Sequence, residues 1–336
     1  MIYDCFTFFN ELDLLEIRLH TLKDVVDKFV IAEATRTHTG KPKNLVFAEN
    51  RMRFSEFEAK IIYIRVDDLL SEEEVAKDIY NLPWVNENRQ RNALIKGLVN
   101  AGDNDVVMIS DVDEIPNPEF VLKAESLLAK SVKSVRFSMA IFNFYLNFRD
   151  YSNLNWLLGT IAVRYSSLLS MEFFAEISFD RYTQKSENIG PTVQQLRFLK
   201  PEVILDNAGW HFSYLGGINM IMQKLAAFSH SEYGSVPIEI VQKRLENGHD
   251  LFGRSGRFFG VEIDSFFPEY IVSNVKKYAH LIFPINEEYL KKTKDARSRA
   301  LVYGKIYRFC ANLIPSCMGQ IVMRARDAIL KMLRLI

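Results

Sequence analysis

Residues 106–116 read VVMISDVDEIP, and this stretch decides the fold class. An apolar run is followed by three acids within four residues, Asp111, Asp113 and Glu114, and then by Pro116. A short continuous apolar run bounded by turn residues is typical of a strand buried in a parallel sheet. Open α/β sheets bind ligands outside the carboxyl ends of their strands, so these acids are expected in a ligand site.

The spacing of the two aspartates points to a metal. Asp111 and Asp113 are two residues apart, so on one strand both side chains point to the same side. Carboxylates this close repel each other unless a cation lies between them. Mg²⁺ and Mn²⁺ are held by a few carboxylates together with the phosphate oxygens of a substrate. The motif in its strand context therefore predicts a site for a divalent metal and a diphosphate, whereas without that context it more often marks a solvated turn.

Apolar runs alternate with helical patterns through the first half of the chain. Strands are predicted at residues 3–9, 28–34, 60–66 and 105–110, and helices at residues 13–23, 84–99 and 120–129. Alternating units of this length predict a parallel, doubly wound sheet. The later pattern is looser, with one or two strands at 132–146, strands at 159–164 and 202–205, helices at 217–229 and 238–247, and a loop at 248–260.

Composition excludes several classes of protein. Lys plus Arg and Asp plus Glu both total 42 in 336 residues, which argues against a nucleic-acid binder. The three cysteines are widely spaced, which favours a reducing compartment over a disulfide framework. We find no signal-peptide pattern and no uninterrupted run of about 18 apolar residues. A cytoplasmic protein is therefore expected.

The last part of the sequence has a different character. Residues 303–336 are helical in period, rich in Leu, Ile, Met and Arg, and carry Asp327 as their only acid. A basic amphipathic helix of this kind can lie on an anionic membrane surface, which would place the protein at the inner face of a membrane. The equally weighted alternative is a helix packed on the body of the protein or in a dimer contact.

Further candidates for nucleotide or phosphate contacts lie before the acids. The predicted helix that ends near residue 99 contains Arg89, Arg91 and Asn92, which could contact a nucleotide or its phosphates. Taken alone, an ordinary surface ion pair between Glu87 and Arg91 is the better interpretation. Glu33 ends the second predicted strand, before a polar loop that could hold a base or ribose.

A second dense cluster reads GWHFSYLGG at residues 209–217. His211 could complete the metal shell or act as a general base, although a histidine among aromatic residues is more often a satisfied core residue. Asp206 and Glu114 are the other candidates for the base, and the sequence does not rank the three. Arg254 lies in a predicted loop that could close over a diphosphate.

Five segments together resemble glycosyltransferase family 17. They are IYDCFTFFNELDLLEIRL at residues 2–19, KFVIAEATRTHTGKPK at 28–43, ENRQRNAL at 87–94, ISDVDEIPNP at 109–118 and GWHFSYLGG at 209–217. The resemblance implies a GT-A fold, a mostly parallel sheet flanked by helices. It also implies a divalent metal, a nucleotide-sugar donor (UDP-GlcNAc in the characterised members), a glycan acceptor and inversion at the anomeric carbon. Asp111 and Asp113 match the family's Asp-x-Asp motif.

The sequence thus predicts a metal-dependent, inverting glycosyltransferase that moves a sugar from a UDP-sugar to a glycan hydroxyl. Mn²⁺ or Mg²⁺ would be held by Asp111, Asp113 and His211. We expect a GT-A catalytic domain over residues 1–285 and a helical extension over residues 286–336. Two alternatives remain open: a phosphatase of the haloacid-dehalogenase type, in which the first aspartate is a nucleophile, and an inactive sugar- or nucleotide-binding scaffold.

Overall fold

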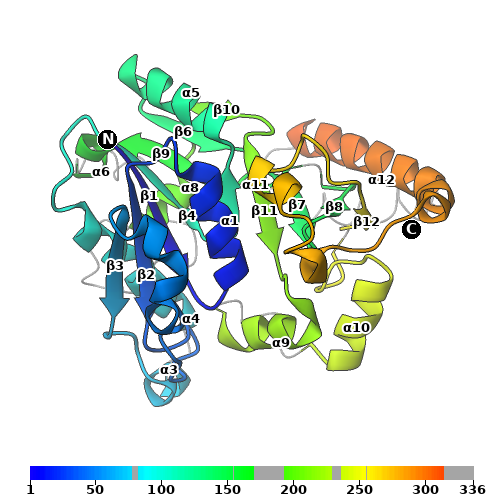
Figure 1. Ribbon diagram of the computed structural model, residues 1–336, viewed down its shortest axis with the longest axis horizontal. Helices are drawn as coiled ribbons and strands as arrows, with labels where there is room; N and C mark the ends of the chain where they lie inside the picture. Colours follow the sequence, from blue (N-terminus) through cyan, green and yellow to red (C-terminus); the bar gives the residue numbers. More distant parts are fainter. Residues whose placement is uncertain (78–81, 154, 170–192, 229–235, 255, 314–336) are drawn as a thin grey trace.

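A seven-stranded sheet forms the centre of the structure, a computed structural model that describes residues 1–77, 82–153, 155–169, 193–228, 236–254 and 256–313 (Figure 1). The strand order is β10-β6-β9-β4-β1-β2-β3. Only β9 runs antiparallel to its neighbours, so the predicted mostly parallel sheet is confirmed. Its strands are β1 (Ile2–Phe8), β2 (Lys28–Ala34), β3 (Ile61–Val66), β4 (Val106–Asp111), β6 (Ser134–Phe137), β9 (Ile161–Arg164) and β10 (Val203–Leu205).

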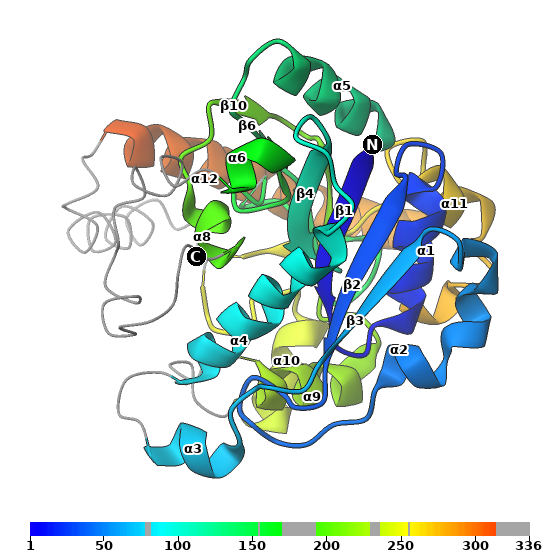
Figure 2. The same ribbon diagram turned by 90° about the vertical axis from the view of Figure 1, so that its left-hand side faces the viewer.

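Helices cover both faces of this sheet, as the alternating sequence pattern predicts; Figure 2 shows α1 and α4 on opposite sides of the strands. One face packs against α1 (Leu12–Leu22), α2 (Val46–Glu49), the 3-10 helix η1 (Arg51–Phe57) and α5 (Pro118–Ala129). The other face packs against the 3-10 helix η2 (Ala93–Leu98), α6 (Tyr165–Leu169) and α8 (Val193–Phe198). Before η2 come α3 (Glu72–Lys77) and α4 (Leu82–Asn92).

A second, five-stranded sheet lies beside the first, in the order β12-β8-β7-β11-β5. Its strands are β5 (Glu114–Pro116), β7 (Ala140–Asn143), β8 (Phe148–Asp150), β11 (Gly209–Ser213) and β12 (Phe258–Gly260). The remaining helices are α9 (Gly217–Ala227), α10 (Ile238–Glu246), α11 (Glu269–Ser273), the 3-10 helix η4 (Ala279–Leu281) and α12 (Glu287–Leu313). Leu14 and Ile17 of α1 pack into the core of this sheet, so α1 contacts both sheets.

The acids leave the strand earlier than their spacing suggested. β4 ends at Asp111, residues 112–113 form a turn, and β5 begins at Glu114 in the other sheet. The expectation that Asp111 and Asp113 share one face of one strand is therefore wrong, because the chain changes sheets between them. Asn117 then caps α5, its Oδ1 accepting from Glu119 N at 3.0 Å, and the proline that follows suits the first turn.

Two other predicted elements differ from the structure. The helix expected over residues 84–99 changes to a 3-10 helix after Asn92, and the loop expected over residues 248–260 contains the short strand β12. The basic tail predicted over residues 303–336 falls partly on α12, while residues 314–336 lie outside the described part of the chain. Within the described ranges, no helix combines the length and apolarity that a membrane crossing requires.

Candidate active site

A pocket of about 240 Å³ opens at the carboxyl ends of β1, β2 and β4, where the two sheets meet. Thr7 and Phe8 end β1, and Arg36 and His38 follow β2. The acid-rich turn after β4 forms its floor, and α4, β11 and α9 supply further walls. This is the edge where parallel α/β sheets bind ligands, so the sequence-based location of the site agrees with the observed pocket.

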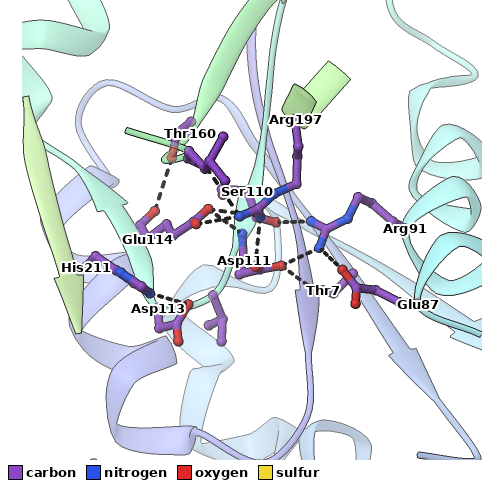
Figure 3. Close-up of polar contacts among 12 residues, drawn as sticks. Thr7, Glu87, Arg91, Ser110, Asp111, Asp113, Glu114, Thr160, Arg197 and His211 are labelled. Carbon is purple, nitrogen blue, oxygen red and sulfur yellow. Dashed lines mark hydrogen bonds and ion pairs between the residues drawn. The ribbon is translucent and has the colours of Figure 1, made fainter. Parts of the chain in front are cut away.

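Asp111 lies between two guanidinium groups, as Figure 3 shows. Its Oδ1 accepts from Arg91 of α4 at 2.7 Å and from Thr7 of β1 at 3.2 Å, and its Oδ2 accepts from Arg197 of α8 at 2.8 Å. Burial alone would raise the pKa of Asp111, but the charges of Arg197 and Arg91 outweigh it and hold the pKa well below its usual range. The Asp111 side chain is 35% exposed and lines the pocket.

Glu114 is buried and saturated with hydrogen bonds. Its carboxylate accepts from Arg197 at 2.7 and 3.1 Å, from the indole of Trp156 at 2.7 Å and from the backbone N–H of Asp111 at 3.0 Å. A general base needs a lone pair directed at the substrate's proton. Because these donors hold both oxygens, Glu114 serves the site as a structural partner of Arg197 and Asp111, and we do not assign it the role of base.

Asp113 forms a second charged group on the opposite side of the turn. Its Oδ2 accepts from Lys224 of α9 at 2.8 Å, and its Oδ1 lies 3.8 Å from Nε2 of His211 on β11. Burial alone would raise the pKa of Asp113, but the charge of Lys224, with a smaller contribution from the neighbouring His211, lowers it below its usual value. His211 Nδ1 is buried without a hydrogen-bond partner among the described residues, and the ring packs against Trp156 with centroids 4.8 Å apart.

The donor set fits a divalent cation that is completed by a ligand, rather than a closed protein site. No group of three His, Cys, Asp or Glu side chains converges on one point in the described ranges. Mg²⁺ and Mn²⁺ sites in nucleotide enzymes need only one or two carboxylates plus substrate phosphates and water. Asp113 and His211 lie close enough to share one ion, whereas both oxygens of Asp111 already bind guanidinium groups.

The structure does not bring the other predicted residues into the pocket lining. Glu33 is fully buried and accepts from the backbone of α2 and from Tyr63. Arg89 donates to a backbone carbonyl after β3, and Asn92 accepts from the backbone at the start of α8. Arg254 pairs with the buried Asp250 in its own loop, and Asp206 is exposed in the turn after β10. Arg91 and His211 are the two outside the acid turn that reach the pocket.

Three residues that shape the site are not among those predicted from the sequence: Arg197, Lys224 and Trp156. Lys224 carried a usable signal, because it is the only charged residue in the mostly apolar helix α9. A single cation on such a helix is expected to have a buried partner. Arg197 and Trp156 lie in segments without a distinctive pattern, and their roles depend on contacts 83 and 42 residues away along the chain.

A comparison with known families covers the part of the chain that contains the acids. Residues 1–151 match the sequence model described as glycosyltransferase family 17. The resemblance to glycosyltransferase family 17 is confirmed for this part of the chain. The matched segment runs from β1 through β8 and includes Arg91, Asp111 and Asp113. It ends before His211, Arg197 and Lys224, so the second half of the site lies outside the family match.

Curated relatives carry the same family resemblance over a shorter segment. The chain is similar to the β-1,4-mannosyl-glycoprotein 4-β-N-acetylglucosaminyltransferase of Homo sapiens, with 33% identity over 119 residues, 34% of this chain and 21% of that protein. The protein of the same name from Mus musculus is 32% identical over the same shares. The chain therefore matches about a fifth of the length of these relatives.

Solved structures with a similar arrangement have low sequence identity. One is glucosyl-3-phosphoglycerate synthase from Mycobacterium tuberculosis in complex with Mn²⁺, UDP and phosphoglyceric acid, with 14% identity and a TM-score of 0.33, covering 81% of this chain and 91% of that one. Another is 4-diphosphocytidyl-2C-methyl-D-erythritol synthase from Anaerococcus prevotii, with 12% identity and a TM-score of 0.34, covering 61% and 86%.

Proposed function

We propose that this protein is a glycosyltransferase that moves a sugar from a nucleotide-sugar donor to an acceptor hydroxyl with the help of a divalent cation. The observation that carries the proposal is the acid turn, residues 111–114, which faces a pocket at the carboxyl edge of the sheet inside the segment that matches glycosyltransferase family 17. The curated relatives are named as N-acetylglucosaminyltransferases, so UDP-GlcNAc is the first donor to test.

Asp113 and His211 would hold the cation, which supplies positive charge for the leaving diphosphate when bound. Arg91 and Lys224 line the same pocket and can donate to phosphate oxygens. Asp111 keeps Arg91 in place through the 2.7 Å contact, so its carboxylate orients a phosphate-binding cation. These residues place charge where a sugar nucleotide separates into a diphosphate and an oxocarbenium-like sugar, and such electrostatic stabilisation is usually the largest catalytic term.

The acceptor hydroxyl needs a group that removes its proton. Asp206 lies outside the pocket lining and Glu114 is saturated, which leaves His211 as the candidate from the sequence that lines the pocket. His211 cannot bind a metal through Nε2 and take a proton there at the same time. His211→Asn separates the two roles: a ligand role predicts weaker Mn²⁺ binding, whereas a base role predicts unchanged Mn²⁺ binding with slower turnover.

The arrangement argues against the phosphatase alternative. A nucleophilic aspartate must present a free oxygen to phosphorus, and both oxygens of Asp111 accept from guanidinium groups at 2.7 and 2.8 Å. Release of UDP from a UDP-sugar supports the transferase, release of inorganic phosphate from a simple phosphoester supports the phosphatase, and donor binding without turnover supports the inactive scaffold.

The deciding experiment measures UDP release from a panel of UDP-sugars with Mn²⁺ or Mg²⁺. Asp113→Asn keeps the size of the side chain but removes the charge, and we expect it to reduce release by at least about a hundredfold while the protein stays folded. Asp67→Asn is the matched control, because Asp67 forms an exposed ion pair with Arg65 away from the pocket. Wild-type UDP release by Asp113→Asn in the presence of metal would refute the assigned site.

A further inference from the structure

Arg18 of α1 lies directly beneath the acid turn and is fully buried. Its Nε donates to Asp4 Oδ2 at 2.8 Å and its Nη2 donates to Asp4 Oδ1 at 2.6 Å, a bidentate pair between α1 and β1. The guanidinium also packs over the ring of Phe6, 4.3 Å from its centroid. A planar fork paired at two points and stacked on a ring has one orientation available to it.

The remaining N–H groups of Arg18 donate to Ser110 and to the acid turn that follows it. Nη1 donates to the backbone carbonyls of Asp111 at 2.9 Å and Glu114 at 2.8 Å, with Val112 O at 3.3 Å, and Nη2 donates to Ser110 Oγ at 2.6 Å. One guanidinium thus contacts four of the five residues from Ser110 to Glu114, where the chain passes from one sheet to the other. None of these contacts involves the carboxylates of Asp111 and Asp113, which line the pocket.

The turn between the two sheets is held partly by groups outside its own strands. Asp111 ends β4 and Glu114 begins β5, and within the turn the Asp113 carbonyl accepts from the backbone N–H of Phe212 in β11 at 2.8 Å. Arg18 supplies partners for the carbonyls of Asp111, Val112 and Glu114 from a buried position, where charge-assisted hydrogen bonds are strong. The separation and direction of the Asp111 and Asp113 carboxylates therefore depend on this guanidinium together with the Phe212 N–H.

We propose that Arg18, itself oriented by Asp4, is a positioning residue that fixes the 111–114 turn in the geometry that holds a cation and the diphosphate of the donor. This inference rests on the proposed function. Partners of metal-binding groups that act from a second layer are typically worth about 10–100-fold in metal affinity or activity. Lysine at position 18 would keep the charge but lose the planar fork that joins Asp4 to the turn.

The test is Arg18→Lys, titrated with UDP in the presence of Mn²⁺ by calorimetry at a temperature where circular dichroism shows it fully folded. We expect the dissociation constant for UDP to rise about 10–100-fold. The matched control is Arg53→Lys, because Arg53 also anchors α1, through Asp13 and Glu16, but does not touch the turn. The control is expected to bind UDP as the wild type does, even where its melting temperature falls.

The possible results separate this inference from the proposed function. A wild-type protein that binds neither Mn²⁺ nor UDP overturns both. A wild-type protein that binds UDP, together with a folded Arg18→Lys that binds it equally well, overturns the positioning role alone. If Arg18→Lys does not fold, Ser110→Ala decides, because it removes only the hydroxyl that accepts from Arg18. Its UDP affinity should fall roughly two- to tenfold, and wild-type affinity would refute the inference.

Discussion

Replacing Arg197 by Met is expected to lower the free energy of unfolding, because Arg197 pairs with two carboxylates in the floor of the pocket. The Arg197 side chain is 9% exposed and makes contacts at 2.7 and 2.8 Å with Glu114 and Asp111. Removing one partner of a buried pair typically costs about 3–5 kcal/mol, because the other charge is left buried without compensation. Asp111 keeps Arg91, and Glu114 keeps Trp156 and one backbone N–H, so we expect a cost near the lower end, about 3 kcal/mol.

Urea unfolding at pH 7.5 measures this cost, with the midpoint converted to a free energy at constant slope. The sharper measurement is a double-mutant cycle with Glu114→Gln. The double variant has no orphan carboxylate at position 114, so it should be more stable than the sum of the two single changes predicts. The coupling energy should lie near the upper end of the range of about 0.5–3 kcal/mol seen for residues in contact.

The difference in unfolding free energy between the wild type and Arg197→Met should also depend on pH, which gives an independent check. The folded-state pKa of Asp111 is depressed, so its contribution to stability is present above the unfolded value of about 3.9 and is lost as the pH falls through the folded value. The unfolding free energy of the wild type should therefore exceed that of Arg197→Met most at neutral pH, and the difference should be smaller below about pH 4. Additive free energies in the cycle, within about 0.5 kcal/mol, would refute the buried-pair reasoning.

Two further predictions concern stability away from the pocket. The pKa of His20 is lowered by burial, so the unfolded chain takes up a proton near pH 6.5 that the folded ring resists, and stability should fall as the pH drops below that value. His20→Phe keeps a ring against Tyr270, stacked at 3.9 Å, and should flatten the slope of unfolding free energy between pH 7.5 and 5.5; an unchanged slope would exclude this residue as the cause. A methyl group at Gly97 would lie 2.4 Å from Val30 Cγ1, so Gly97→Ala should cost about 1–3 kcal/mol in urea unfolding. Gly102→Ala, where the nearest atom lies at 3.8 Å, should change stability by less than about 0.5 kcal/mol, and equal effects at both glycines would contradict the packing argument.

Local patterns were sufficient to predict the strands that build the site. The strand at residues 28–34 matches β2 at both ends, and the apolar run before the acids matches β4 within one residue. These runs are continuous because β1, β2 and β4 are buried on both faces, which is the signature of a parallel sheet with helices on both sides. The location of the acids at the ligand edge followed from that alone.

Proximity along the chain does not predict the position of several candidate residues. Asp206 lies five residues before His211, but it occupies the exposed turn after β10, and the chain enters β11 only at Gly209. Glu33 lies near the end of β2, and the residues that follow this strand line the pocket. The Glu33 side chain instead accepts from backbone N–H groups of α2. Arg91 could be predicted because a helix of known period brings it to one face, whereas Arg197 and Lys224 depend on the tertiary fold.

The balance of charge in the pocket supports a ligand that carries its own counter-ion. The carboxylates that line it are Glu11, Glu87, Asp111, Asp113 and Glu114, and the cationic side chains are Arg36, Lys43, Arg91 and Lys224, with Arg197 directly behind the acids. The diphosphate of a nucleotide sugar carries two negative charges, which a divalent cation cancels. The complex is then neutral and enters a pocket whose acidic and basic side chains, counted with Arg197, are equal in number.

Removal of the metal tests this reasoning. Without a divalent cation, the diphosphate would have to draw Lys224 away from Asp113, which would leave that buried carboxylate without its lysine partner. We therefore expect UDP affinity, measured by calorimetry, to fall more than about tenfold when EDTA replaces Mn²⁺, and to recover when excess Mn²⁺ is restored. In Lys224→Met the Asp113 carboxylate has lost its competing cation, so Mn²⁺ should bind this variant more tightly than the wild type. Equal UDP affinity with and without EDTA would mean that the basic side chains alone neutralise the diphosphate, and the acids would then need a different explanation.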